Sequence, residues 1–253
     1  MNNIVICLIS CFLGSVAFGG TIENESKDNK HIEYAKGFKY VYKISGEYED
    51  SSNTSFYASA VAIEPEWILT AAHVVTNIRS GYITQEDGIQ NVIKKFICHS
   101  DFKNYNFGYC DIALCRLEKK LSLDFYPELY SQKDEVGKIC CISGFGNTGT
   151  FVTGASIASG GKRRAGSNIV DEIDRHLLIC SPSLNRNKTD LEFLIANGDS
   201  GGGLFISNKL AGINSCVISS DKKTDSSYGD QGGHTRVSVF KEWIIKTIET
   251  ERQ

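Results

Sequence analysis

The 253-residue sequence lacks a strong net charge, since 27 Lys and Arg residues nearly balance 30 Asp and Glu residues to leave −3. It therefore carries no general attraction for nucleic acid or anionic membranes, and we expect neither as a partner. Its longest apolar run, Ile4 to Phe18, is shorter than the roughly 20 residues that cross a bilayer. Helical periodicities are few, whereas 24 glycines are present, which favours a β-rich fold with many turns.

The sequence also lacks a Cys-x-x-Cys pair and a cluster of histidines, so we expect no metal site. Nine cysteines are present, and two of them, Cys7 and Cys11, lie in the apolar run near the start. The seven others cannot all pair within one chain because their number is odd. We expect most of them to be buried free thiols that behave as small hydrophobic side chains.

Residues 1–17 predict a secretory signal peptide. The apolar run gives way to polar sequence at Thr21, and Ser15-Val16-Ala17 has the small-x-small pattern of a cleavage site. An alternative is lipidation, because Leu8-Ile9-Ser10-Cys11 resembles a bacterial lipobox. A lipidated Cys11 would leave the rest of the apolar run on the mature protein, which argues against it. We therefore expect cleavage near Ala17 and a secreted or periplasmic protein.

The stretch Asn197-Gly198-Asp199-Ser200-Gly201-Gly202-Gly203 is typical of an activated serine on a tight turn. Glycine permits the backbone to fold so that the amides of Gly198 and Ser200 point at one spot, as an oxyanion hole requires. A serine hydroxyl is a weak nucleophile and needs a base. Two apolar, strand-like segments supply a base and an acid: the run Trp67 to His73, and Asp111 with the apolar residues that follow it.

These three motifs, in this order, resemble those of the trypsin-like (chymotrypsin-fold) serine peptidases: T-A-A-H at His73, D-I-A-L at Asp111 and G-D-S-G-G at Ser200. The resemblance implies an endopeptidase that cleaves polypeptides through an acyl-enzyme without a cofactor. His73 would be the general base, Asp111 would orient it, and Ser215 would support Asp111. It further implies an all-β fold of two six-stranded antiparallel β-barrels, with the active site between them and a C-terminal α-helix.

On this resemblance, residues 18–253 form one peptidase domain, which we expect to be monomeric. Its expected parts are a first barrel at about 37–125, a second barrel at about 135–237 and a helix at about 239–250 that packs on the second barrel. Outside these parts, local composition predicts a polar surface arm over Thr21–Lys36, a solvated basic loop tip at Lys162–Arg164 and a short helix over Val170–Leu178.

The disulfides of the family's animal members do not carry over to this chain. Val74 follows His73, and Tyr57 stands on the strand that would supply its bridging partner. Ala196 occupies the cysteine position beside the nucleophile, and Ile206 stands where Cys140 would find its usual partner.

The resemblance also locates a substrate pocket formed by Leu194, Ser215, Val217, Gly232 and His234. Leu194 stands where trypsins carry the aspartate that binds substrate Lys or Arg, and Val217 stands on the pocket wall. We expect cleavage after small or medium apolar residues. The alternative is that His234 at the base of the pocket favours an acidic substrate side chain.

In the family, a new amino terminus pairs with the aspartate before the nucleophile, here Asp199. The segment Ala17-Phe18-Gly19-Gly20-Thr21 resembles that terminus, so removal of the signal peptide would deliver Phe18 to Asp199 without a separate activation step.

Two alternative interpretations remain, each from a different class of protein. Gly198-x-Ser200-x-Gly202 also matches the nucleophile elbow of α/β-hydrolases, but a strand-like Leu204-Phe205-Ile206 follows it where that fold needs a helix. The second is a catalytically silent homologue that acts as a binding module.

Overall fold

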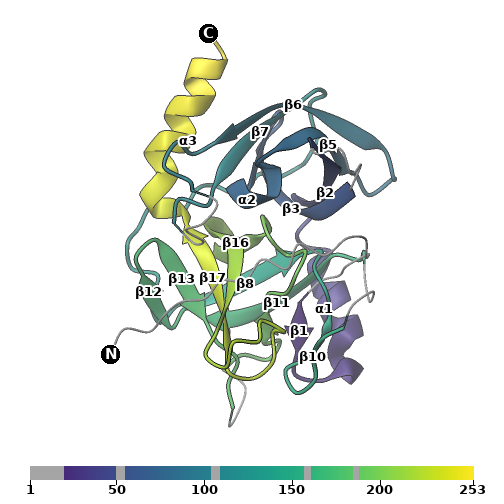
Figure 1. Cartoon of the computed structure of the whole chain (residues 1–253), viewed down its shortest axis with the longest axis vertical. Coiled ribbons are helices and arrows are strands. Elements are labelled where there is room, and N and C mark those ends of the chain that lie inside the picture. Colours follow the sequence, from purple (N-terminus) through teal and green to yellow (C-terminus); the bar gives the residue numbers. More distant parts are fainter. Residues whose placement is uncertain (1–19, 50–54, 104–108, 157–160, 185–187) are drawn as a thin grey trace.

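The protein is described by a computed structural model that covers residues 20–49, 55–103, 109–156, 161–184 and 188–253. Two β units lie one above the other, and the C-terminal helix runs along the upper one (Figure 1). The helices are α1 Asp28–Ala35, α2 Ala72–Val75 and α3 Val237–Glu251, with a 3-10 turn, η1, at Glu25–Lys27. The strands, in chain order, are β1 Thr21–Ile22, β2 Val41–Tyr48, β3 Ser55–Glu64, β4 Trp67–Thr70, β5 Ile78–Thr84, β6 Gln90–Cys98, β7 Ala113–Leu117, β8 Ile139–Gly144, β9 Gly149–Thr150, β10 Gly154–Ala155, β11 Arg164–Ile169, β12 Glu172–Asp174, β13 Leu177–Cys180, β14 Phe193–Leu194, β15 Gly203–Ile206, β16 Lys209–Ser219 and β17 Asp230–Arg236.

The first β unit is a closed antiparallel barrel of six strands in the order β2-β3-β4-β7-β6-β5, as the sequence predicts. Strands β4 and β7 are its most buried elements, and the side chains of Trp67, Ile68, Leu69 and Leu114 have no more than 1% of their surface exposed. Burial on both faces accounts for the apolar run of β4 from Trp67 to Leu69 and that of β7 from Ala113 to Cys115. Closure leaves no free strand edge in this unit.

The second β unit differs from the predicted closed barrel of six strands. It is a seven-stranded sheet in the order β11-β8-β15-β16-β17-β13-β12. The extra edge strand, β12, comes from the segment Val170–Leu178, for which a helix was predicted wrongly. Arg175 has a left-handed φ of 54°, which reverses the chain and forms a β12–β13 hairpin. β13 then pairs with β17, so partners distant in the sequence override a helical spacing of apolar residues.

The segment Thr21–Lys36 is structured, contrary to the predicted surface arm. Strand β1 pairs with β14 and β9, and α1 packs against β11. Buried His31 shares a hydrogen bond of 3.0 Å with the carbonyl of Ala165. This helix lies beside the second unit in Figure 1.

Of the basic run Lys162–Arg164, for which a solvated loop tip was predicted, Lys162 is exposed but the two arginines are not. Arg164 is buried and forms a two-point ion pair with Asp28 of α1, at 2.6 and 2.9 Å. Arg163 donates hydrogen bonds to the carbonyls of Ala35 and Val41. Both arginines therefore join α1 to the rest of the molecule.

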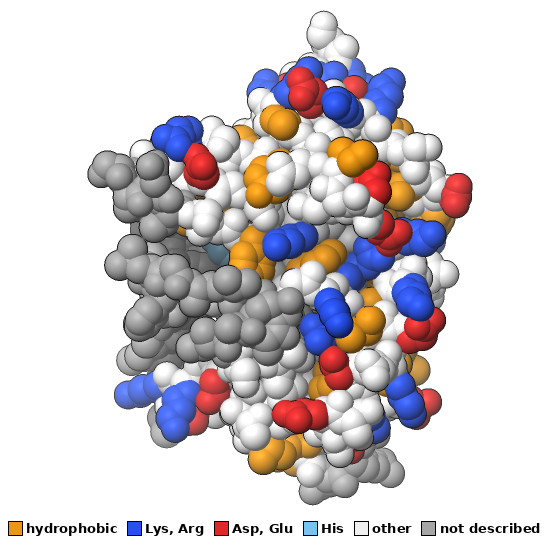
Figure 2. Space-filling view, turned by 90° about the vertical axis from the view of Figure 1, so that its right-hand side faces the viewer, with side chains coloured by type: hydrophobic (Ala, Val, Ile, Leu, Met, Phe, Trp, Pro, Cys, Tyr) orange, Lys and Arg blue, Asp and Glu red, His pale blue; other side chains and the backbone are white. Residues whose placement is uncertain are grey.

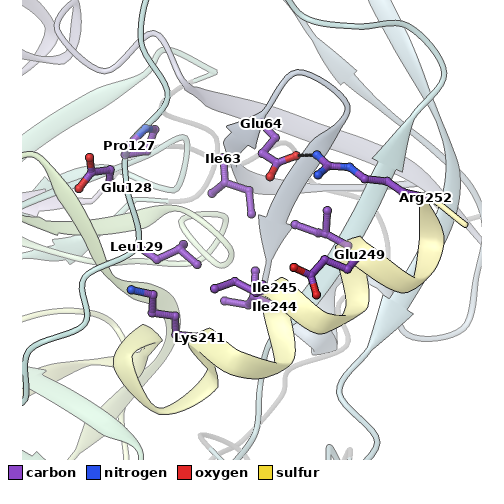
Figure 3. A pocket seen from close by; sticks show the side chains of 11 residues that line it. Ile63, Glu64, Pro127, Glu128, Leu129, Lys241, Ile244, Ile245, Glu249 and Arg252 are labelled. Atoms are coloured by element: carbon purple, nitrogen blue, oxygen red, sulfur yellow. Dashed lines mark hydrogen bonds and ion pairs between the residues drawn. The ribbon is translucent and has the colours of Figure 1, made fainter.

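Helix α3 confirms the predicted C-terminal helix, and it contacts β16 of the second unit, as predicted, while it also packs along the first barrel. Its buried face is Val237, Phe240, Ile244 and Ile248, which share a core with first-barrel residues. A groove with a cavity of about 400 Å³ runs along this helix. Figure 3 shows the side chains that line it and the ion pair between Arg252 and Glu64 of β3. None of the predicted site residues lines this groove.

The face shown in Figure 2 carries Lys and Arg intermingled with Asp and Glu, in agreement with the small net charge. Within the part of the chain that the structure describes, no helix is long and apolar enough to cross a membrane.

Candidate active site

Barrel pairing brings His73 and Asp111 to one edge of the first unit. Strand β4 ends at Thr70, and the chain turns into the short helix α2, which carries His73. Asp111 immediately precedes β7, and Thr70 pairs with Ala113 in the β4–β7 ladder. Each motif therefore follows or precedes a buried strand at the same end of the barrel.

Asp111 is completely buried and holds His73 at two points. Its Oδ2 lies 2.8 Å from His73 Nδ1, and its Oδ1 accepts a hydrogen bond of 2.9 Å from the His73 amide. Ser215 Oγ donates a third hydrogen bond, of 2.6 Å, to Oδ2. Burial alone would raise the pKa of Asp111, but His73 and the three hydrogen bonds outweigh burial and lower it. The carboxylate therefore stays ionised and keeps the proton of the His73 ring on Nδ1.

The loop that carries Ser200 comes from the second unit but is anchored to the first. The Ser59 amide of β3 donates to the Ser200 carbonyl at 2.8 Å, and Ser59 Oγ donates to the Gly198 carbonyl at 3.0 Å. Thr70, at the end of the strand before His73, donates to the Ser59 carbonyl at 2.8 Å. This chain of bonds fixes the serine loop beside the end of β4.

The amides of Gly198 and Ser200 are oriented by bonds to the carbonyls that precede them. The Asn197 carbonyl accepts from the Asn147 amide at 2.6 Å. The Asp199 carbonyl accepts from the Gly202 amide at 2.9 Å and from Asn214 Nδ2 at 3.2 Å. A trans peptide directs its N–H opposite to its carbonyl, and no described peptide is cis. Both N–H groups therefore point away from the loop's interior, and neither donates to another described residue.

Gly201 shows why this motif needs glycine after the serine. Its φ is +82°, and a Cβ there would lie 2.0 Å from Thr70 Oγ1 and 2.1 Å from the Ser59 carbonyl oxygen. Any side chain would push the serine loop away from β3 and β4.

Asp199 is buried beside the N-terminal segment. Its carboxylate accepts hydrogen bonds from the amides of Gly146 and Ala196, at 2.8 and 2.9 Å, and also from the amide of Gly20. Burial raises the pKa of Asp199 to about 7 in spite of these donors. Asp199 forms no ion pair with another described residue. Phe18, the terminus that the sequence predicts for this carboxylate, lies outside the described residues.

Gly20 cannot be replaced without strain. Its φ is +71°, and a Cβ would lie 2.0 Å from the ring of Phe193. Thr21 and Ile22, which follow it, are buried and pair with Leu194 and Phe193 of β14. The first described residues are therefore packed against β14, which precedes the serine loop in the chain.

Of the predicted pocket residues, Leu194, Val217 and His234 lie close to Gly232. A Cβ on Gly232 would lie 3.1 Å from His234 Nε2, 3.2 Å from Ile195 Cγ1 and 3.4 Å from Leu194 Cδ1. Val217 pairs with Gly232 across β16 and β17. Leu194 and Ile195 are buried, so the space below Gly232 is filled by apolar side chains.

His234 is buried, and its tautomer follows from its hydrogen bond to Asn214. Its Nδ1 lies 2.9 Å from Asn214 Oδ1, and the Nδ2 of that amide is spent on the Ser143 and Asp199 carbonyls. Asn214 Oδ1 can only accept, so the proton is on Nδ1 and Nε2 carries a lone pair without a described partner. Burial lowers the pKa of His234 to about 3.

Sequence reasoning missed three residues that shape this site: Ser59, Asn214 and Ile195. Ser59 interrupts the apolar run from Phe56 to Ile63, and Asn214 stands with Ser215 between Ile213 and Cys216; these breaks in the apolar pattern were the available signal. The seven described cysteines are thiols rather than halves of disulfides, and five of them are buried.

Comparisons with known proteins agree with this geometry. The Trypsin family model matches residues 39–244. The relatives include snake venom serine protease KN5 of Trimeresurus stejnegeri, 30% identical over 221 residues, with 79% of this chain and 80% of the relative covered. Human kallikrein-4 is 26% identical over 210 residues, covering 76% of this chain and 78% of the relative.

Solved structures show the same fold. HL collagenase aligns with a TM-score of 0.66 at 21% identity, covering 84% of this chain and 94% of its own. Mouse neuropsin aligns with a TM-score of 0.64 at 19% identity, covering 83% and 95%. The matched family model, the venom and kallikrein relatives and the chymotrypsin-type fold together lead to one conclusion: this chain belongs to the trypsin family and is a serine endopeptidase.

Proposed function

We propose that the chain is an exported endopeptidase in which His73, Asp111 and Ser200 form the catalytic triad. The observation that carries this proposal is the buried Asp111 carboxylate, which is hydrogen-bonded to the backbone amide and ring Nδ1 of His73 and to Ser215. In the proposed mechanism, His73 takes the proton of Ser200 as the serine oxygen attacks the substrate carbonyl. Asp111 stabilises the imidazolium that forms, and His73 then returns the proton to the leaving amine.

The amides of Gly198 and Ser200 are the proposed oxyanion donors. Their support is the set of inward bonds on the Asn197 and Asp199 carbonyls, which leaves both N–H groups available on the outer side of the loop. Fixed donors of this kind stabilise developing charge without reorganisation, and the loss of one costs roughly 3–4 kcal/mol. Water then attacks the acyl-enzyme on the same site and releases the second product.

For processing, we infer cleavage between Gly19 and Gly20 rather than at Phe18. Ala17-Phe18-Gly19 has small residues at the two positions that signal peptidase reads. Cleavage there would place a positively charged amino group where the Gly20 amide meets the Asp199 carboxylate. A buried carboxylate without a cation is costly, so this pairing would stabilise the arrangement of the serine loop. The enzyme would then be active on export, and the venom protease among its relatives is consistent with export.

For specificity, we propose cleavage after small or medium apolar residues such as Ala, Val and Leu. Leu194 and Ile195 offer an apolar base, and the described atoms nearest to Gly232 include no carboxylate that could bind Lys or Arg. The acidic alternative loses support because His234 presents a lone pair at Nε2, and its low pKa keeps it neutral. A lone pair repels a substrate carboxylate.

This specificity is tested directly with a peptide library in which the residue before the cleaved bond is varied and kcat/KM is measured for each peptide. We expect cleavage after Ala, Val and Leu, because Val217, which pairs with Gly232, would narrow a pocket whose base is formed by apolar side chains. Val217→Gly should shift kcat/KM towards Phe relative to Ala by about 10- to 200-fold, the range for a methylene or more of pocket space. The control Val136→Gly, at an exposed valine, should leave the preference unchanged. Cleavage confined to Lys and Arg, or to Asp and Glu, would contradict the proposed pocket.

A further inference from the structure

Three side chains with metal-binding atoms lie together outside the triad: His99, Asp101 and Cys110. One ligand atom of each lies within 4.8 Å of the other two. This cluster could not be predicted from the sequence, because the spacing of the three residues matches no common ligand motif. The fold brings it together: His99 follows strand β6, Cys110 precedes Asp111, and the His99 amide donates to the Ile112 carbonyl at 3.0 Å.

Two of these three ligands are held in place by their surroundings. The His99 ring packs against Phe240 and Trp243 of α3, with ring centres 5.1 and 5.0 Å away. Cys110 is buried and has a left-handed φ of 53°, which is rare for a residue with a side chain. Asp101 is exposed and is free to move by rotation, and its amide donates to His99 Nδ1 at 3.2 Å. The cluster therefore combines two fixed ligands with one adjustable ligand on the solvent side.

We propose that His99, Asp101 and Cys110 bind one zinc ion, with water as the fourth ligand. Nitrogen, carboxylate oxygen and thiolate sulfur are the donors that zinc takes, at about 2.0–2.3 Å, whereas calcium and magnesium take oxygen alone. Ligands at these distances in a tetrahedron lie about 3.3–3.8 Å apart, so the cluster would close by no more than about 1.5 Å on binding. Cys110 binds as the thiolate, and its proton passes to solvent.

A zinc ion bound at this position would stabilise the segment that carries Asp111. Cys110 is joined directly to Asp111, and the Ile112 amide donates to the Cys110 carbonyl at 2.8 Å. Thr235 of the second unit holds the Asp111 carbonyl at 3.0 Å. An ion that ties Cys110 to His99 fixes the turn that presents Asp111, and binding to the folded state alone raises the unfolding temperature as zinc is added.

The experiment uses the full mature protein with Ser200→Ala, which prevents self-cleavage and keeps the result independent of the proposed catalysis. Zinc is titrated by calorimetry, and cobalt(II) is titrated as a spectroscopic substitute that reports a thiolate ligand in the near ultraviolet. We expect one equivalent of each metal to bind, the thiolate-to-cobalt band to appear and the unfolding temperature to rise with zinc.

His99→Gln, Asp101→Asn and Cys110→Ser should each weaken zinc binding, with at least about a hundredfold loss for His99 and Cys110. Cys98→Ser, at a cysteine outside the cluster, should leave both the affinity and the cobalt band unchanged. Should Cys110→Ser fail to fold, His99→Gln decides, since circular dichroism shows whether it is folded. Absence of stoichiometric binding, or binding that persists in the folded His99 variant, overturns the proposal.

Discussion

Ser200→Ala and His73→Ala are each expected to lower turnover roughly a millionfold, and the double variant should lose little more. The two residues act as one unit, because a serine without its base, or a base without its serine, performs no acyl transfer. Turnover is measured on the best peptide of the library. Circular dichroism and thermal unfolding should be near those of the parent, since neither side chain is part of the apolar core.

Ser80→Ala provides the matched control, because Ser80 is an exposed serine on strand β5. It should retain full activity. Near-normal turnover in a folded Ser200→Ala protein would remove Ser200 from the mechanism and with it the proposed triad.

The second large effect concerns the amino terminus. Protein that begins at Gly20 is expected to be active as made, whereas protein that begins at Phe18 should lose about a hundredfold or more in kcat/KM. In the longer form, Gly20 offers Asp199 a neutral amide instead of a charged amino group. Breaking a buried charge pair costs roughly 3–5 kcal/mol, which weakens the ordered state of the serine loop. Both forms are made by cleavage of a fusion at the chosen residue, and their termini are verified by mass spectrometry.

Stability against pH distinguishes these two forms without an activity assay. With Gly20 in peptide linkage, the Asp199 pKa of about 7 lies above its unfolded value, so the folded state binds more protons between about pH 4 and 7. The longer form should therefore lose stability as pH rises through this window, by at most about 1.4 kcal/mol per pH unit from this group. The form that begins at Gly20 should lack this loss, because its amino group lowers the Asp199 pKa. Equal activity in the two forms, together with an equal dependence of their stability on pH, would contradict the proposed role of Gly20.

The sequence predicted the strands beside the proposed site better than it predicted the contacts between distant segments around it. His73 and Asp111 are adjacent to continuous apolar strands, and burial of those strands fixes both positions. Gly201 likewise has one conformation and no space for a side chain, so its identity is required by the backbone. Such local requirements are visible in sequence.

The features of the structure that the sequence did not predict depend on contacts between segments that are distant along the chain. Helix α1 has a polar composition typical of a surface arm, and it is fixed by the ion pair between Asp28 and Arg164. The direction of the Gly198 amide depends on Asn147, and the position of the loop depends on Ser59. The hairpin that replaced a predicted helix depends on pairing of β13 with β17. In each case local propensity is weaker than tertiary pairing.

Labelling with a fluorophosphonate probe tests the central claim most directly, because this probe reacts with an activated serine and not with an ordinary one. The protein that begins at Gly20 should be modified once, and peptide mapping should locate the modification on Ser200. Labelling should disappear in His73→Ala, in which Ser200 is present but has no base. A folded protein that resists the probe, or one labelled at another serine, would contradict the proposed triad and would favour a silent homologue that acts as a binding module.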